Sequence, residues 1–299
     1  MAATETSRDQ AAGAPGASLL VRLRGIRPSL SPAEDRVAEK VLADPRAAAA
    51  LTISELASAA STSETTVLRF CRRLGLPGYP QLRLRLAEES AQPRTSTTQD
   101  TDISAKDTIA DIIAKVAFVD ASAVEETAQQ LDHESLAETA RAIAAAKRVD
   151  IYGAGASAIV GTDLQQKLHR IGVVAFAWND PHIALTSATL LDRGDVAIAI
   201  SHSGTTSETI EALEAARSRG ATTVAVTNFP LSRLAERADH VLTTAARETS
   251  LRSGATASRI AALTVVDCLY IAVAQRHLTR ARKAVKETRQ AVAGHHVGS

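Results

Sequence analysis

Aromatic residues are scarce in this sequence, since phenylalanine, tryptophan and tyrosine together make up 3% of its 299 residues. Proteins that hold single-stranded nucleic acid usually stack its bases on aromatic rings. Hydrophobic residues nevertheless make up 45% of the chain, so its cores must pack mainly alanine, valine, leucine and isoleucine. The scarcity of aromatic residues therefore argues against a binder of single-stranded nucleic acid.

Only two cysteines are present, Cys71 and Cys268. They fall in different predicted domains, each among apolar neighbours at helical spacing, so we interpret both as small buried side chains. This interpretation excludes a disulfide, and the histidines do not have the spacing of metal ligands. We therefore predict that the protein has no metal site and no cofactor.

Long apolar runs are also missing. No segment approaches the roughly 18 uninterrupted apolar residues of a membrane span, and the N-terminus lacks a basic segment followed by an apolar one. We expect a cytoplasmic protein without a membrane partner.

A chain of 299 residues is long enough for two domains of about 100 to 200 residues each.

The net charge of +1 conceals two blocks of opposite sign. Residues 65–87 contain five arginines and no acidic residue, whereas residues 100–138 contain ten acidic residues and two lysines. A basic block beside an acidic one indicates that the first contacts a polyanion.

The apolar pattern divides the chain into five parts. We predict a disordered arm over residues 1–17, a helical domain over 18–90, a linker and connecting helix over 91–135, an α/β domain over 136–276 and a basic tail over 277–299. In the α/β domain, apolar runs of strand length alternate with helix-length segments, at residues 149–152, 173–177, 196–200, 223–227 and 240–244. This alternation predicts a five-stranded parallel sheet between two layers of helices, preceded by an all-α helix-turn-helix bundle.

Three helices have clear start signals between residues 31 and 74. Ser31-Pro32-Ala33-Glu34 and Thr52-Ile53-Ser54-Glu55 each combine an N-cap hydroxyl with a capping-box glutamate. Residues 61–63 form a turn, and a third helix over about residues 64–74 directs its apolar residues inward at helical spacing. A short helix, a turn and an amphipathic helix are the helix-turn-helix arrangement.

The outer face of the third helix carries hydroxyl and arginine side chains that suit double-stranded DNA. Residues at its start would contact base edges, and its arginines would reach phosphates or bases. The predicted DNA-binding residues are Thr62, Ser63, Thr65, Thr66, Arg69, Arg72, Arg73 and Arg83. The alternative is a three-helix core whose arginine face is merely solvated.

Two strand-to-helix turns of the α/β domain are rich in glycine and hydroxyl groups, at residues 153–157 and 201–208. Glycine lets the backbone approach a ligand closely, and a helix N-terminus offers free N–H groups to an anion. Hydroxyls without a lysine or arginine beside them in the sequence suit a phosphate monoester. The alternative is a polar loop that only caps the next helix, through Thr206 or Ser207.

Gly153-x-Gly155-x-x-Ala158 also fits a dinucleotide fingerprint, which requires an acidic residue at the end of the second strand. That strand is followed by Trp178-Asn179, and Asp180 comes late. The Gly-Lys-Ser/Thr of a nucleotide triphosphate site is missing. Both patterns disfavour a nucleotide-binding enzyme.

Residues from about 19 to 89 resemble the DNA-binding domain of the RpiR family of sugar-responsive regulators, most closely at residues 53–57, 67–75 and 78–79. Residues from about 136 to 276 resemble a sugar isomerase (SIS) domain, through Gly153-x-Gly155-x-Ser157 and Ser201-x-Ser203-Gly204-x-Thr206-x-x-Glu208. In the SIS family, the hydroxyls of such loops hold the phosphate of a phosphosugar. The resemblance implies a ligand site at Gly155, Ser157, Ser201, Ser203, Gly204, Thr206 and Glu248.

Two residues of this implied site have alternative roles. Glu248 occupies the region where SIS enzymes place an acid-base glutamate, so it is a sugar-hydroxyl ligand in a sensor or else a surface residue. His202 is either a general base or a residue that fills an unconstrained position of the motif, and we favour the second interpretation.

These features predict a DNA-binding transcriptional regulator of sugar or amino-sugar metabolism, controlled by a phosphorylated sugar and without catalytic residues. A phosphosugar isomerase or lyase is the alternative, but it leaves the helix-turn-helix unexplained. Because SIS domains commonly pair and the last apolar helix is long, we expect a homodimer or tetramer on a two-fold symmetric operator. The sequence leaves hexosamine, pentose and muramic acid phosphates open as effectors.

Overall fold

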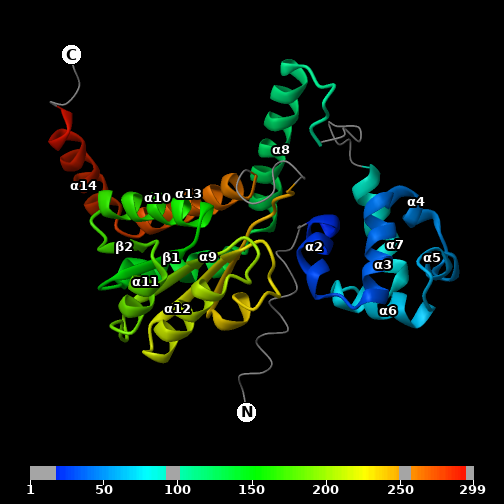
Figure 1. The fold of residues 1–299 in the computed structure, drawn as a ribbon, viewed down its shortest axis with the longest axis horizontal. Helices are drawn as coiled ribbons and strands as arrows, with labels where there is room; N and C mark the ends of the chain where they lie inside the picture. Colours follow the sequence, from blue (N-terminus) through cyan, green and yellow to red (C-terminus); the bar gives the residue numbers. More distant parts are fainter. Residues whose placement is uncertain (1–17, 92–101, 249–256, 294–299) are drawn as a thin grey trace.

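The computed structural model describes residues 18–91, 102–248 and 257–293, which form a helical domain and an α/β domain (Figure 1). The predicted arm over residues 1–17 and the linker residues 92–101 lie outside the described residues.

The N-terminal domain is a bundle of short helices around one apolar core. The helices are α2 (Leu19–Ile26), α3 (Pro32–Ala43), α4 (Pro45–Ala50), α5 (Ile53–Ala59), α6 (Glu64–Arg73) and α7 (Tyr79–Ala91), with a 3-10 turn η2 (Arg27–Ser29). The predicted capping boxes are present at Ser31 and Thr52. The core includes Leu23, Leu56 and Phe70, none of which is exposed. The predicted helix-turn-helix arrangement is confirmed.

The α/β domain continues the chain after α8 (Ile109–Gln130). Its elements are α9 (His133–Ala145), β1 (Val149–Gly153), α10 (Ala156–Arg170), β2 (Ala175–Trp178), α11 (Pro181–Ala188), β3 (Val196–Ile200), α12 (Ser207–Ser218), β4 (Thr222–Thr227), η3 (Ala235–Arg237), β5 (His240–Thr243), α13 (Ala257–Arg276) and α14 (Leu278–Ala291). All strand pairs are parallel, and the order across the sheet is β2-β1-β3-β4-β5. The five predicted strands are therefore confirmed.

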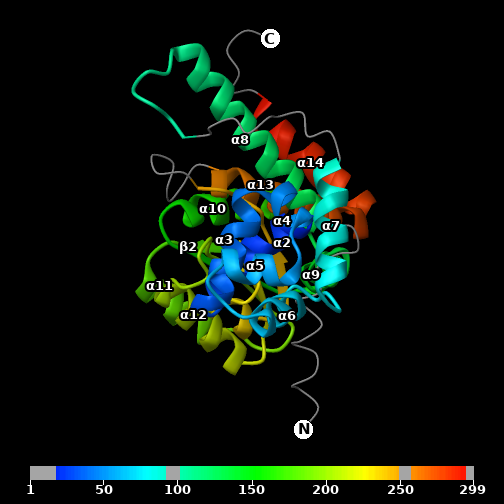
Figure 2. The same ribbon diagram turned by 90° about the vertical axis from the view of Figure 1, so that its right-hand side faces the viewer.

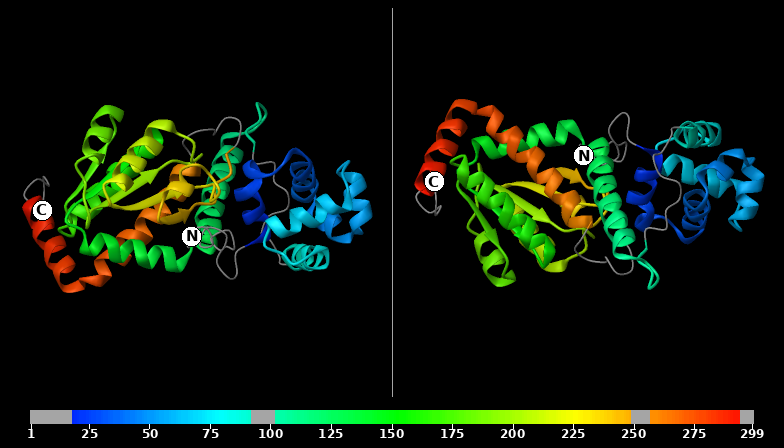
Figure 3. Two further views of the ribbon diagram at one scale, coloured as in Figure 1. Left: turned by 90° about the horizontal axis from the view of Figure 1, so that it is seen from below. Right: turned by 90° about the horizontal axis from the view of Figure 1, so that it is seen from above.

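Helices cover both faces of the sheet (Figure 3). Alternate residues of each strand point to opposite faces, so Ile151 joins the core under α9, α10 and α13, and Tyr152 joins the core under α11 and α12. Both side chains are 1% exposed. The predicted three-layer α/β fold is confirmed.

The described part of the chain contains one helix, α13, that is long and apolar enough to cross a membrane, with a mean hydropathy of 1.7. In the fold this helix contacts α8, α9 and α10. Its buried side, which includes Val265 and Leu269, belongs to the main core of the α/β domain. The length and apolar composition of α13 therefore also suit a helix at the centre of the layer that covers the sheet.

Residues 278–291 of the predicted basic tail form the helix α14, which follows α13 directly. Ala281 and Val285, four residues apart, face the main core, so the basic residues of this segment occupy the outer side of an amphipathic helix. The predicted tail residues 294–299 lie outside the described residues.

The connecting helix α8 has two unlike halves. Its C-terminal half packs against α13 and buries Val119, Ala123 and Thr127. Its N-terminal half projects from the body of the molecule (Figure 2), and there Ile109 is 72% and Ile113 is 64% exposed.

Candidate functional site

The strand order places one crevice at the centre of the sheet. From β1 the chain crosses to β2 on one side, and β3 then lies on the other side of β1. In open parallel sheets, ligands bind outside the carboxyl ends of the strands where the order reverses in this way. The loops after β1 and β3, which the sequence predicts as an anion site, meet at this point.

The loop after β1 depends on two glycines. Gly155 is the N-cap of α10 with a φ of 55°, a conformation that favours glycine. A Cβ at Gly153 would lie 2.9 Å from the backbone carbon of Ser157, so no other residue fits there. The Ser157 side chain, which follows this close turn, lines a cavity together with His202 from the loop after β3.

The loop after β3 holds its hydroxyls in a fixed arrangement. The Ser201 hydroxyl lies 3.0 Å from that of Thr206 and accepts a hydrogen bond from the Gly204 N–H at 3.1 Å. Ser203 is exposed, and its oxygen accepts from the N–H of Thr205 at 3.3 Å. Thr206 is the N-cap residue of α12, but its side chain makes no capping hydrogen bond there. Helix capping therefore does not account for its hydroxyl.

Gly204 also joins this loop to the segment after β4. Its φ is 64°, and a Cβ there would lie 2.0 Å from the Ser232 hydroxyl oxygen. The backbone N–H of Asn228 donates to the carbonyl of His202 at 3.1 Å, and the N–H of Leu234 donates to that of Gly204 at 3.0 Å. Backbone hydrogen bonds thus tie the loop after β3 to residues 228–234.

A cavity lies between these loops and the start of α13. Its polar lining is formed by Ser157, His202, Thr227, Thr244, Ser258 and Arg259. Sequence reasoning missed Ser258 and Arg259, because they begin a helix far along the chain and carry no local motif. Arg259 gives this cavity a positive charge that the loops themselves lack.

Glu248 and His202 belong to the same cavity region. A Glu248 oxygen accepts a hydrogen bond from the Ser258 hydroxyl at 2.7 Å. Burial lowers the pKa of His202, and the negative charge of Glu248 partly opposes that shift. The buried Nδ1 of His202 has no hydrogen-bond partner among the described residues. His202 therefore lines the cavity, and Glu248 lies next to the cavity through its bond to Ser258.

The predicted DNA-binding residues mostly lie on the outer face of α6 and the turn before it. Thr65, Arg72 and Arg73 are exposed, as is Ser63, whose hydroxyl accepts from the Thr66 N–H at 3.3 Å. Thr62 is half-buried. Thr66 is 8% exposed and its hydroxyl lies 3.1 Å from that of Ser63, so its predicted place on the open face is wrong. It lies one turn before the buried Phe70 and shares the inward side of the helix.

Two arginines of the same region also have structural partners. The Nε of Arg69 donates to Glu34 on α3 at 3.0 Å, and the Nε of Arg83 donates to the Ala49 carbonyl at 3.0 Å. Both side chains keep further donors and remain exposed. The turn, α6 and α7 thus expose hydroxyl and positively charged guanidinium groups.

The turn before α6 is held from α3 by a residue that sequence reasoning missed. Arg36 donates to the carbonyls of Ala60 and Ser61 at 3.0 and 2.9 Å. Ser61 has a φ of 48° and is the one residue other than glycine with a positive φ in the described ranges. Arg36 therefore stabilises the turn, in which the positive φ of Ser61 is a strained conformation.

Comparison with known proteins covers both domains. The family model for the helix-turn-helix domain of the rpiR family matches residues 17–93, and the model for the SIS domain matches residues 142–272. An uncharacterized HTH-type transcriptional regulator of Caldanaerobacter subterraneus subsp. tengcongensis is 39% identical, over 86% of this chain and 91% of the relative.

Two solved structures are also similar. The Vibrio vulnificus NanR protein complexed with ManNAc-6P is 32% identical, with a TM-score of 0.60 over 94% of this chain and 100% of that one. The sugar isomerase domain of an RpiR transcription factor from Sphaerobacter thermophilus is 27% identical, with a TM-score of 0.55 over 60% of this chain and 98% of that one.

Proposed function

The chain belongs to the RpiR family of helix-turn-helix regulators with a SIS domain, and from this premise we propose that it is a transcriptional regulator of sugar or amino-sugar metabolism. A phosphorylated sugar controls its binding to operator DNA. The observation that carries the proposal is the pair of glycine- and hydroxyl-rich loops at the reversal of strand order, in a chain that also presents a basic helix-turn-helix surface.

The DNA interface is the positively charged surface around α6. In this proposal α6 enters the major groove, where Ser63 and Thr65 at its start contact base edges. Arg72 and Arg73 reach bases or phosphates, as do Thr62, Arg69 and Arg83 at the margins. Thr66 is left out because its side chain is buried.

The effector site is the cavity at the carboxyl ends of β1 and β3. The phosphate contacts the hydroxyls of the two loops and the backbone N–H group at Gly155, and Arg259 neutralises its charge. The hydroxyls in question are those of Ser157, Ser201, Ser203 and Thr206. The sugar then lies toward Glu248 and His202. Because the similar NanR structure holds ManNAc-6P, a 6-phosphate of an N-acetylated amino sugar is the first effector to test.

A phosphosugar isomerase is the second candidate, and His202 beside Glu248 is the observation that favours it. A histidine and a carboxylate close to each other can move protons between sugar carbons. We propose binding without catalysis, because the regulator explains both domains. An assay of aldose–ketose interconversion with each sugar phosphate separates the two candidates, since sustained turnover is expected only of the isomerase.

We propose further that the protein acts in the cytoplasm as a homodimer or tetramer. The exposed Ile109 and Ile113 on the projecting half of α8 supply apolar area for a second copy. Two copies would read half-sites about one DNA turn, or a multiple of it, apart. Sedimentation that finds a monomer at micromolar concentration, still bound tightly to a single half-site, would contradict this assembly.

The test of the function needs DNA and ligands together. Duplexes selected from a random pool by the purified protein provide the operator, and ManNAc-6P, glucosamine 6-phosphate, arabinose 5-phosphate and muramic acid 6-phosphate provide the ligand panel. A true effector raises the midpoint of thermal unfolding by mass action and changes operator affinity. The proposal fails if no duplex is enriched, or if no panel member does both.

A further inference from the structure

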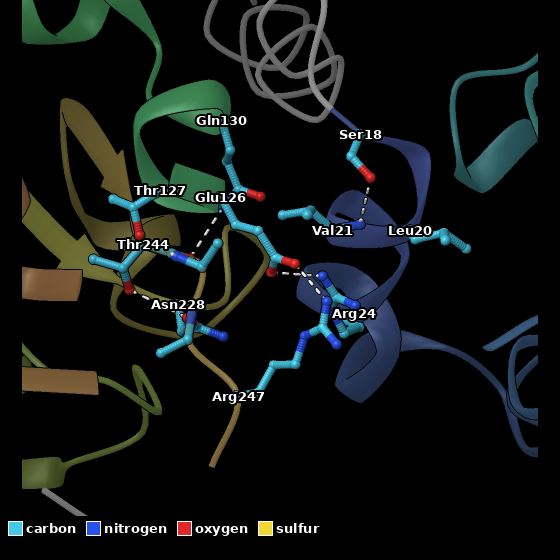
Figure 4. A network of polar contacts seen from close by, with 12 residues as sticks. Ser18, Leu20, Val21, Arg24, Glu126, Thr127, Gln130, Asn228, Thr244 and Arg247 are labelled. Atoms are coloured by element: carbon cyan, nitrogen blue, oxygen red, sulfur yellow. Dashed lines mark hydrogen bonds and ion pairs between the residues drawn. The ribbon is translucent and has the colours of Figure 1, made fainter. Parts of the chain in front are cut away.

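The two domains meet where α2 packs on the α/β domain (Figure 4). A Cβ at Gly25 of α2 would lie 3.4 Å from the Pro230 side chain and 3.6 Å from the Asn228 carbonyl, so the two backbones approach closely. Leu231, from the same segment after β4, packs against the core of the N-terminal domain. The joint therefore includes the segment that is fixed to the loop after β3.

Three charged side chains from separate elements also meet at this joint. Glu126 of α8 accepts a hydrogen bond from Arg24 of α2 at 2.7 Å, and its other oxygen pairs with Arg247 of the segment after β5 (Figure 4). The Glu126 side chain is only 14% exposed. One carboxylate thus lies between two guanidinium groups, one from each domain.

The segment that carries Arg247 is tied to α8 and to the segment after β4. The Ala245 N–H donates to Thr127 at 3.0 Å, and the Gln130 amide donates to the Thr244 carbonyl at 3.1 Å. The Ala246 N–H donates to the Asn228 side chain at 2.7 Å. Because this backbone has partners on both sides, a displacement at one end is transmitted to the other.

Arg247 and Glu248 are consecutive, yet they face different sites. Arg247 pairs with Glu126 at the domain joint, whereas Glu248 bonds to Ser258 beside the effector cavity. A ligand that engages Glu248 must shift or hold the backbone on which Arg247 stands. Sugar binding and the ion cluster at the joint therefore share a single peptide unit.

We propose that Glu126 is the positioning residue that couples the effector cavity to the helix-turn-helix domain. Its two ion pairs hold α2 in one arrangement, and a ligand on Glu248 changes those pairs through Arg247. The inference rests on the proposed function, because it requires an effector in the cavity. Neutralising Glu126 leaves Arg24 and Arg247 facing each other without the intervening carboxylate, so the two domains lose this connection.

The test compares Glu126→Gln with Glu125→Gln, which removes the same charge one residue away on the exposed side of α8. Among the described residues, Glu125 has one hydrogen-bond partner, the Gln129 amide on the same helix, which donates to it at 3.3 Å. The readout is the factor by which ManNAc-6P, or whichever panel member raises the thermal midpoint of the parent, changes operator affinity. Allosteric factors are typically about 5- to 150-fold.

We expect Glu126→Gln to bind the ligand in calorimetry and yet to lower this factor to within about twofold of unity, with Glu125→Gln like the parent. The triple variant Arg24→Glu/Glu126→Arg/Arg247→Glu reverses every charge and should restore the factor. If Glu126→Gln does not fold, Arg247→Gln provides the same comparison, because Arg247 is 46% exposed.

A parent-like factor in Glu126→Gln, or in Arg247→Gln when that variant replaces it, overturns the coupling but leaves the proposed function standing. A parent protein that responds to no panel member overturns both.

Discussion

Arg69 on α6 and Glu34 on α3 form an ion pair whose two members differ sharply in exposure, with 59% of the Arg69 side chain exposed and 1% of Glu34. Burial alone would raise the pKa of Glu34, but hydrogen bonds from Ser31 and Arg69 and the charge of Arg73 leave it below its usual value. Arg69 therefore holds α6 to the bundle through its Nε–H group, although most of its side chain remains exposed.

The first prediction separates these two roles of arginine. Arg69→Ala leaves a buried carboxylate without its cation, so the free energy of unfolding should fall by about 1–3 kcal/mol, whereas Arg73→Ala should change it by less than about 0.5 kcal/mol. Either substitution should weaken specific operator binding by about 1–3 kcal/mol if its guanidinium reads guanine.

Urea unfolding measures the stability, and titration of the selected duplex at fixed salt measures the affinity. Equal stability of the two variants would remove the structural role of Arg69. Operator binding by the Arg69→Ala/Arg73→Ala double variant at the strength of the parent would remove α6 from DNA recognition.

The second prediction concerns the hydroxyls of the loop after β3. Ser203→Ala and Thr206→Val each remove one hydroxyl, and each should weaken sugar phosphate binding about 10- to 150-fold, because a hydrogen bond to a charged group contributes about 1.5–3 kcal/mol. Operator affinity without effector should persist. Calorimetry provides the measurement, and Ser207→Ala is the control, because this exposed hydroxyl bonds to Glu208 instead. An equal loss in Ser207→Ala would show that these hydroxyls are not the phosphate ligands.

The third prediction compares two glycines with similar positive φ. Gly204→Ala places a Cβ 2.0 Å from the Ser232 hydroxyl, whereas a Cβ at Gly155 meets nothing within 4 Å. Both variants have a strained backbone, which costs of order 1–3 kcal/mol, but only Gly204→Ala must also displace the segment after β4. Its thermal midpoint should therefore be the lower of the two. Equal thermal midpoints of the two variants in a calorimetric scan would mean that the segment after β4 can be displaced without a loss of stability.

The fourth prediction follows from His202. Because burial lowers its pKa, the folded protein binds fewer protons there than the unfolded chain does below the unfolded pKa of about 6.5. This histidine therefore reduces stability as the pH falls through that range. Between pH 7.5 and 5.5, His202→Gln should remove up to about 1.4 kcal/mol of that loss relative to the parent.

Urea unfolding of parent and variant at both pH values gives this difference, and the exposed His277 provides the control as His277→Gln. A pH dependence unaltered by His202→Gln, or one altered as much by His277→Gln, would mean that the imidazole of His202 does not titrate in this way.

Local patterns were sufficient to predict the five strands and the helix-turn-helix. Apolar runs of strand length that alternate with helix-length segments predicted the five strands, and the capping boxes at Ser31 and Thr52 predicted two helix starts. Thr66 was predicted on the exposed face of α6, but it is buried. It lies at the border between the two faces of the helix, where helical spacing alone does not decide between them. Arg259 and the partners of Glu126 had no sequence signal, since they come from elements that only the tertiary fold brings together.

The close packing of Gly25 against Pro230 bears on attempts to build biosensors by joining domains of different regulators. A hybrid protein that keeps this N-terminal domain also keeps Gly25, whose missing side chain leaves room on α2 for a proline of the sensor domain. A foreign sensor domain without that proline would leave a gap at the junction. Sugar binding to this sensor would then not change the affinity of the hybrid for DNA. Grafting residues 228–231 together with the new sensor is therefore the smallest exchange that we expect to transmit a signal.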